Sequence, residues 1–228
     1  EISIYTTQAD NVSIRDLWKA HYRAILAANA VVAFTPDSPD ESLTTEERNQ
    51  YVAEAKFMRS LLMFQLVNLF AQPINVGGED ALGVPIVTDA FSGEIVAYPR
   101  NTVGEVHDFI INELEGIVAD LPESYESSAF TRGRATKGAA NALLSRIHLY
   151  RGEWQLAAEK AKAVLDADAV YGLASNYSFW GENNSEYVFS IQNSEIDNGR
   201  TGSGGWGSYY NSAEDGGRGD TPFSDYLI

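Results

Sequence analysis

A helical period of apolar residues is the feature that most constrains this chain, and it recurs in five stretches between residues 13 and 168. Within each stretch the spacing of apolar side chains is near 3.6, which places them on one face of an α-helix. The predicted helices begin near residues 14, 45, 103, 136 and 154, and the first four end at or before Pro36, Pro73, Pro122 and Gly152. The sequence therefore predicts a mainly α-helical fold.

Helix starts are marked by capping boxes, in which a Ser or Thr caps the helix and an acidic residue three positions later returns a hydrogen bond. We assign full boxes to Thr44 with Glu47 and to Thr102 with Glu105, and a short version to Ser13 with Asp16. The second predicted helix is apolar almost all round between residues 57 and 70. We therefore expect this helix to be central and buried on most sides.

The last two predicted helices have the spacing of a tetratricopeptide-type hairpin. This spacing places a leucine, a turn glycine, an aromatic residue and a small residue at Leu144, Gly152, Trp154 and Ala157. The five helix starts keep no fixed period, so we predict irregular tetratricopeptide-like helical repeats that form an α/α superhelix. We expect Trp18 and Trp154, on apolar helix faces, to pack in the core.

Composition changes after the fifth predicted helix. We assign residues 1–175 to the helical scaffold and residues 176–228 to a loop-rich C-terminal segment with many Gly, Asn, Ser and aromatic residues. In that segment only residues 187–191 have the pattern of a strand. Because the chain starts abruptly and residues 222–228 read as the opening of a further element, we expect a fragment whose C-terminal part continues the same domain.

Charge and cysteine content exclude several classes of function. The chain carries 16 basic and 32 acidic residues, a net charge of −16. Phosphate contacts need clustered Lys and Arg, so this charge argues against a nucleic-acid partner, and equally against electrostatic docking on an anionic membrane. The absence of cysteine removes disulfides, thiolate zinc sites, iron–sulfur clusters and cysteine nucleophiles. No apolar run approaches the roughly 20 residues that span a bilayer.

The titratable residues form no catalytic or metal-binding pattern. The histidines, His21, His107 and His148, stand alone within predicted helices. Two carboxylates suffice for glycoside hydrolysis, but 32 acidic residues meet that condition by chance. We therefore predict no catalytic residue, no metal and no cofactor. Arg134 and Lys137 lie at the start of the fourth helix, where anions can bind, yet we expect structural ion pairs or a loop anchor there.

Candidate ligand-binding residues lie in the loop-rich segment. A sugar packs its C–H face on an aromatic ring while its hydroxyls find polar partners, and Tyr and Trp offer an apolar body with a polar tip. The candidate rings and their polar neighbours are Trp180, Trp206, Tyr209, Tyr210, Asn183, Asn184, Arg200 and Asn211. The alternative is that these aromatic residues fill a core that lacks regular structure.

Three segments carry a more specific signal. They are Ala53-Glu54-Ala55-Lys56-Phe57-Met58-Arg59-Ser60 with its continuation to Pro73, Gly133-Arg134-Ala135-Thr136-Lys137-Gly138-Ala139-Ala140 with its continuation to Trp154, and Gly83-Val84-Pro85-Ile86-Val87 followed by Arg100-Asn101-Thr102-Val103. In order and separation they resemble the SusD/RagB family of outer-membrane nutrient-binding lipoproteins. One departure is Ala71, where the family often has glycine. Family members also run to about twice this length.

The resemblance implies a lipid-anchored, surface-exposed protein on a Bacteroidetes-type outer membrane. Such a protein caps a SusC-like, TonB-dependent outer-membrane transporter and hands it oligosaccharides without catalysing a reaction, as part of polysaccharide utilisation. The lipid-carrying N-terminal cysteine and the C-terminal half would both be missing from the present chain.

Two other functions compete with glycan binding. Helical repeats build grooves suited to peptides, so a scaffold that binds a partner protein is one alternative. A glycoside hydrolase is the other.

Overall fold

The computed structural model describes residues 10–174, 183–193 and 214. The chain divides into two compact units, Glu1–Phe189 and Ser190–Ile228, and the elements below belong to the first. The predicted boundary between residues 175 and 176 stays a prediction. The helices are α1 (Val12–Phe34), α2 (Thr45–Phe70), α3 (Ile74–Gly77), α4 (Val103–Glu115), the 3₁₀ turn η2 (Val118–Asp120), α5 (Ser128–Gly133), α6 (Lys137–Arg151) and α7 (Trp154–Leu165).

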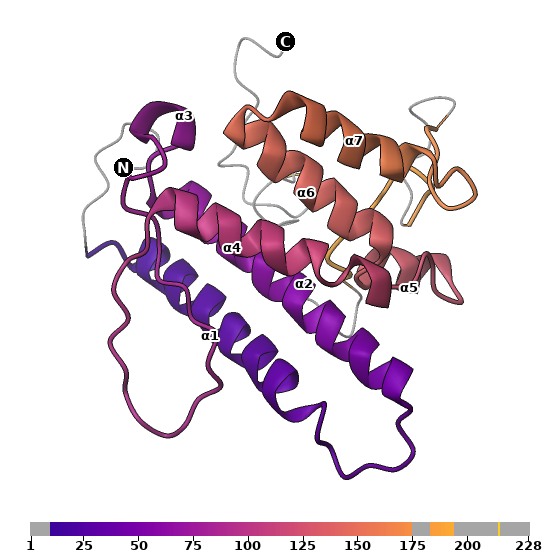
Figure 1. Cartoon of the computed structure of the whole chain (residues 1–228), viewed down its shortest axis with the longest axis horizontal. Coiled ribbons are helices and arrows are strands. Elements are labelled where there is room, and N and C mark those ends of the chain that lie inside the picture. Colours follow the sequence, from indigo (N-terminus) through magenta and orange to yellow (C-terminus); the bar gives the residue numbers. More distant parts are fainter. Residues whose placement is uncertain (1–9, 175–182, 194–213, 215–228) are drawn as a thin grey trace. The chain divides into compact units, whose positions relative to one another are not determined.

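Neighbouring helices pack side by side, α1 on α2, α2 on α4, α4 on α6 and α6 on α7 (Figure 1). This confirms the mainly helical prediction and the central place of α2. Fully buried side chains of the core include Ile25, Phe57, Met63, Leu66, Ile110, Leu114, Leu144 and Ile147. Over the described residues, no helix combines the length and the hydropathy needed to cross a membrane.

Two of the three predicted capping boxes are confirmed. At α2, Glu47 N donates to Thr44 Oγ1 at 3.1 Å, and Thr44 N donates to Glu47 Oε2 at 2.8 Å. The same reciprocal pair joins Thr102 and Glu105 at the start of α4. The hydrogen bonds from the two threonine backbones lower the pKa of both glutamates. Both helix starts are therefore fixed by local sequence.

Two helix ends differ from the prediction. The first helix is capped by Asn11, whose Oδ1 accepts from Ile14 N at 3.1 Å, so Ser13 lies inside the helix and the predicted box at Ser13 is wrong. Asparagine is as good an N-cap as serine, and it comes two residues earlier. The third predicted helix ends at Glu115, because a glycine follows and η2 replaces its last turn.

The α6–α7 hairpin confirms the tetratricopeptide-like prediction. Gly152 ends α6 in the left-handed conformation with φ of 76°, which glycine adopts without steric cost. Across the hairpin, Ser145 Oγ donates to the Ala157 carbonyl oxygen at 2.8 Å. Ala157 is buried between the helices, as its small side chain predicts.

The two tryptophans expected in the core differ. Trp18 packs edge-to-face on Phe70, with ring centroids 4.8 Å apart, so its prediction is confirmed. Trp154 is 67 % exposed, and its prediction is wrong. It is the first residue of α7, and helical side chains point back towards the N-terminus, so the ring extends past the helix end beside the turn.

The strand-like segment at residues 187–191 forms no strand, and neither does any other segment that the structure describes. Phe189 instead packs edge-to-face on Phe57 of α2, with centroids 5.2 Å apart. Val188 and Phe189, which are adjacent in the sequence, therefore pack against the helical core instead of alternating as in a strand. An isolated bridge between Leu82 and Thr102 is the nearest approach to a sheet in the described part.

Candidate functional site

Most of the predicted ligand-binding residues lie outside the described residues. These are Trp180, Trp206, Tyr209, Tyr210, Arg200 and Asn211, and their role stays a prediction. Asn183 and Asn184 are described and form a turn at the C-terminal edge of the segment that contains Trp180.

The two asparagines have different surroundings. Asn183 adopts a positive φ of 60°, a conformation that asparagine tolerates better than most residues. Among the described residues its Oδ1 atom is buried and has no hydrogen-bond partner. Asn184 Oδ1 accepts from Glu186 N at 2.8 Å, so this side chain closes the turn. This hydrogen bond gives Asn184 a structural role in the turn, and its role in ligand binding stays a prediction.

Arg132, on the short helix α5, ties down this turn. Its Nε donates to the Asn184 carbonyl oxygen at 3.0 Å, and its Nη2 donates to the Val170 carbonyl oxygen at 2.7 Å. The guanidinium also lies over the Tyr171 ring, 4.8 Å from its centroid. Neither α5 nor the role of this arginine is predicted from the sequence. The local sequence signal for α5 is Ser127, whose Oγ accepts a hydrogen bond from Phe130 N and caps the helix.

The ends of the loop around Trp180 are fastened to each other. Gly172 N donates to the Ser185 carbonyl oxygen at 3.0 Å, and Ser185 Oγ donates to the Gly172 carbonyl oxygen at 2.9 Å. Tyr171, the preceding residue, is held through its hydroxyl by Thr136 Oγ1 at 2.8 Å. The scaffold thus fixes where this predicted ligand-binding loop leaves and rejoins the helices.

Arg134 and Lys137 form the structural ion pairs that the sequence predicts. Arg134 donates twice to the Glu54 carboxylate, at 2.6 and 3.0 Å, and its guanidinium stacks 4.2 Å from the centroid of the Tyr125 ring. The hydrogen bonds to Glu54 raise the pKa of Arg134 despite its partial burial. Lys137 Nζ lies 3.1 Å from the carboxylate of Glu123. These cations brace α2, α6 and the segment between η2 and α5.

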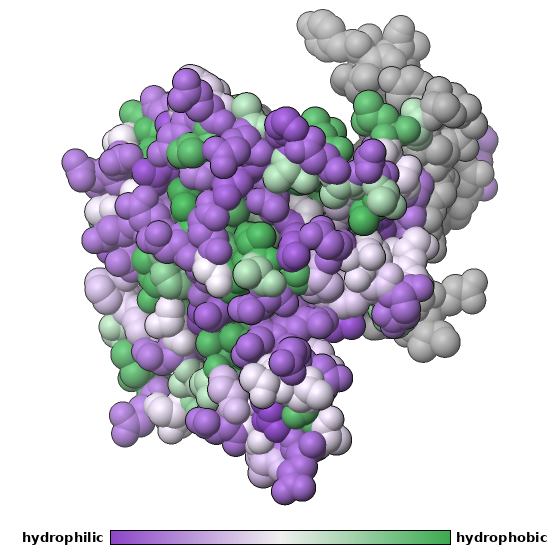
Figure 2. Space-filling model, turned by 45° about the vertical axis from the view of Figure 1, so that its right-hand side comes forward, coloured by the Kyte–Doolittle hydropathy of each residue, from purple (hydrophilic) through white to green (hydrophobic). Residues whose placement is uncertain are grey.

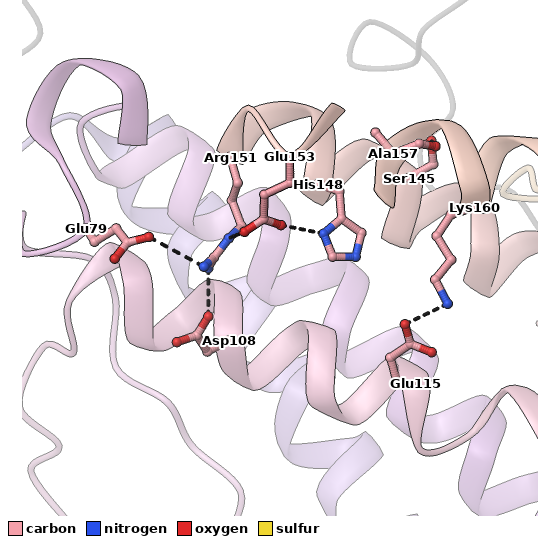
Figure 3. A network of polar contacts seen from close by, with 9 residues as sticks. All are labelled: Glu79, Asp108, Glu115, Ser145, His148, Arg151, Glu153, Ala157 and Lys160. Carbon is pink, nitrogen blue, oxygen red and sulfur yellow. Dashed lines mark hydrogen bonds and ion pairs between the residues drawn. The ribbon is translucent and has the colours of Figure 1, made fainter. Parts of the chain in front are cut away.

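Arg151 is the centre of a second ionic cluster (Figure 3). It contacts the carboxylates of Asp108 at 2.7 Å, Glu153 at 2.8 Å and Glu79 at 3.4 Å. Glu153 also accepts from His148 Nδ1 at 2.5 Å. Burial opposes ionisation of Glu153, but the His148 and Arg151 contacts outweigh it and lower the pKa of this carboxyl. These carboxylates join α4, α6 and the α6–α7 turn, and each is engaged in holding the scaffold.

The other two histidines also have structural surroundings. His21 contacts the Leu17 carbonyl oxygen and the Gln65 side chain at 2.9 and 3.0 Å. His107 is 2 % exposed, and burial, aided by the nearby Arg151 charge, lowers its pKa to about 4. In the described ranges, no group of three or more His, Asp and Glu residues is placed to hold a metal ion.

Two hollows adjoin α1. An apolar groove of about 780 Å³ lies between α1 and α2, with the exposed Phe34 at one end of its lining. A second hollow of about 490 Å³ lies between α1 and the segment 87–98. Both volumes fall within the usual range for ligand pockets. The face drawn in Figure 2 is mostly hydrophilic, with separate apolar patches.

An array of paired helices, with arginines that anchor loops to them, defines a helical-repeat fold. Residues 3–149 match the SusD-like family model described as "Starch-binding associating with outer membrane". The chain belongs to this SusD-like family, which confirms the resemblance found in the sequence.

Known proteins agree with this assignment. The SusD-like protein P25 of Formosa agariphila is 27 % identical over 196 residues, which cover 85 % of this chain and 33 % of that protein. A SusD superfamily structure from Bacteroides thetaiotaomicron superposes with a TM-score of 0.70 at 28 % identity, covering 79 % of this chain and 39 % of that one. A laminarin-binding SusD-like protein superposes with a TM-score of 0.65 at 26 % identity, covering 77 % and 37 %. The chain spans about a third of the length of the curated relatives it matches.

Proposed function

We propose that this chain is part of a non-catalytic glycan-binding protein that serves nutrient uptake at the outer membrane. The observation that carries the proposal is the family match over residues 3–149, whose description names starch binding at the outer membrane. The laminarin-binding neighbour adds a second glycan within the same fold. The whole protein would be lipid-anchored on the cell surface and would deliver oligosaccharides to a SusC-like, TonB-dependent transporter.

A non-catalytic role for three of the described carboxylates is supported by the ion pairs that hold them in the scaffold. Glu54 and Glu113 each pair with a scaffold arginine, and Glu153 pairs with Arg151 and His148. A glycosidase needs one carboxyl group as an acid and a second as a base or nucleophile beside the scissile bond. Glu54, Glu113 and Glu153, held in scaffold ion pairs, do not meet this need.

Affinity electrophoresis tests the proposal. The full-length protein is run through native gels that contain laminarin, starch or another neutral polysaccharide, and we expect one of them to retard it. Trp180→Ala or Trp206→Ala should abolish that retardation. Trp154→Ala is the matched control, because Trp154 is the first residue of α7, outside the predicted ligand-binding segment, and its exposed ring can be truncated without loss of core packing. Release of reducing ends from the retarding glycan would contradict the non-catalytic role.

The transporter needs its own test. We expect an affinity-tagged full-length protein to co-purify from solubilised outer membranes with a TonB-dependent transporter. Failure to bind any glycan together with failure to recover a transporter would overturn the proposed function.

The α1–α2 groove supports a second candidate, a scaffold that binds a peptide or a partner protein. Phe34 is 66 % exposed and Val31 38 % exposed along this groove, which offers an apolar surface to a partner chain. Under this reading, Val31→Asp would abolish binding of the partner, whereas Trp180→Ala and Trp206→Ala would leave it intact. The opposite pattern would favour glycan binding.

A further inference from the structure

The hollow between α1 and the segment 87–98 has features that neither the family motifs nor the predicted ligand residues explain. Figure 1 shows this segment as part of the long loop that joins α3 to α4 beside α1. The hollow measures about 490 Å³, and three aromatic residues line it: Tyr22 on α1, and Phe91 and Tyr98 on the loop.

The inner wall of the hollow is fixed to α1. Asn29 is fully buried, and its Nδ2 donates to the carbonyl oxygens of Val87 and Asp89, both at 3.0 Å. About two turns earlier on the same helix, the Tyr22 hydroxyl donates to the Pro85 carbonyl oxygen at 2.9 Å. With its hydroxyl used in this way, Tyr22 offers its ring to the hollow. The site is therefore partly preformed, which lowers the entropic cost of binding.

Polar contacts hold together the two ends of the loop segment 89–98. The Tyr98 hydroxyl donates to Asp89 Oδ2 at 3.0 Å, which joins the start and the end of residues 89–98. Just beyond this segment, Arg100 donates to the carbonyl oxygens of Gly83 and Leu82 at 2.6 and 2.9 Å. The outer part of the loop, residues 90–97, is thus held over α1 from a fixed base.

The chemistry of the lining selects a class of ligand. Among the described residues of the lining, the polar side chains beyond the tyrosines are Asp89, Ser92 and Glu94, and none is Lys, Arg or His. Carboxylates accept hydrogen bonds from hydroxyl groups and repel anions. The aromatic rings offer faces for the apolar side of a pyranose.

We propose that this hollow is a second saccharide-binding site, which takes one or two units of a neutral glycan and excludes glycans with uronate or sulfate groups. It uses none of the residues between 180 and 211 that the sequence predicts for the first site. The proposal rests on the proposed glycan-binding function and adds a location and a charge preference to it.

Methyl NMR of the intact protein tests the proposal at the site itself. Leu26, Val87, Ile95 and Val96 carry methyl groups in the lining of the hollow. The probes are laminaritriose, maltotriose, cellotriose and xylotriose as neutral ligands and tri-galacturonate as the acidic one. We expect one neutral trisaccharide to shift these methyl signals in a saturable way, and tri-galacturonate to leave them unchanged.

A matched pair of variants gives the control. Phe91 and Phe34 are both 66 % exposed, but Phe91 lines this hollow and Phe34 lines the α1–α2 groove. Because both rings are exposed, neither truncation should unfold the protein. Phe91→Ala should weaken the affinity reported by the methyl signals about five- to tenfold, as expected for the loss of one ring face. Phe34→Ala should leave that affinity unchanged.

The outcomes separate this proposal from the proposed function. Retardation in polysaccharide gels with silent cavity methyls would overturn the second site and leave glycan binding in place. Equal loss in Phe91→Ala and Phe34→Ala, or equal binding of tri-galacturonate, would also overturn it. Cavity shifts that survive Trp180→Ala and Trp206→Ala would support it. Silence of all methyl signals together with no retardation by any glycan would overturn both.

Discussion

The buried ion pair between Arg59 of α2 and Glu113 of α4 gives the sharpest stability prediction. The two side chains are 4 % and 7 % exposed and are joined by two hydrogen bonds, one of them from Nε to Oε2 at 3.0 Å. Arg59 Nη1 also donates to Asn29 Oδ1 at 2.7 Å, and Ser60 Oγ donates to Glu113 Oε2 at 3.1 Å. Glu113 thus neutralises a guanidinium that has little access to water.

Glu113→Gln removes this charge and leaves Arg59 buried beside a neutral amide. Breaking a buried pair in this way costs about 3–5 kcal/mol of the free energy of unfolding. In a protein of this size each kcal/mol lowers Tm by about 2–4 °C. We therefore expect Tm to fall by roughly 6–20 °C, measured by circular dichroism at 222 nm.

Two further variants control this prediction. Asp166→Asn breaks the exposed pair with Lys162, whose side chains are 71 % and 62 % exposed, and should cost less than about 1 kcal/mol. The double variant Arg59→Met/Glu113→Leu removes both charges and should recover part of the loss, because no unpaired charge stays buried, although the buried Asn29 Oδ1 loses its donor. A loss for Glu113→Gln no larger than that for Asp166→Asn would refute the reasoning.

Three other changes test the scaffold. Gly138→Ala should destabilise the fold by about 1–3 kcal/mol in chemical denaturation, because a Cβ there would lie 2.3 Å from the Tyr171 ring. Replacing the ring in Tyr171→Leu should reduce that loss of stability. An unchanged loss in the Tyr171→Leu background would contradict the clash. Gly152→Ala should cost about 1 kcal/mol, because φ is 76° at this position, and a midpoint equal to that of the wild type would disprove this strain. His107 has a pKa of about 4 in the folded state against 6.5 in the unfolded state, so the unfolded chain binds the extra proton between these values. Stability should therefore fall by about 3 kcal/mol as pH drops from 6.5 to 4, and His107→Leu should flatten this part of the pH profile, measured by urea titration; an unaltered slope would rule out His107 as its source.

The sequence predicts the helices well because their signals are local. Capping at Thr44 and Thr102, the glycine turn at Gly152 and the 3.6-residue period all act within a few positions of one another. The sequence predicts that Arg134 forms an ion pair, but it does not identify Glu54 as the partner, since 80 positions separate the two residues.

Other features depend on contacts that no local pattern reports. Helix α5 has six residues, and Arg132 within it is defined by carbonyl oxygens 38 and 52 positions away. The exposure of Trp154 depends on its place at the end of α7, where a periodic pattern is too short to distinguish a buried face from an open end. Local rules therefore predict where helices form better than they predict what each helix end contacts.

The residues of the family motifs hold the scaffold and its loops in place, whereas the candidate binding residues lie outside these motifs. Arg59 and Arg134, which lie in the segments that carry the resemblance, are engaged with carboxylates of the scaffold. Arg59 also orients Asn29, and Asn29 holds the loop carbonyl oxygens of Val87 and Asp89. The motif residues thus set the position of loops without defining their outer side chains. Under the proposed function, a glycan would meet those outer side chains, so a motif that identifies this family carries little information about which glycan would be bound.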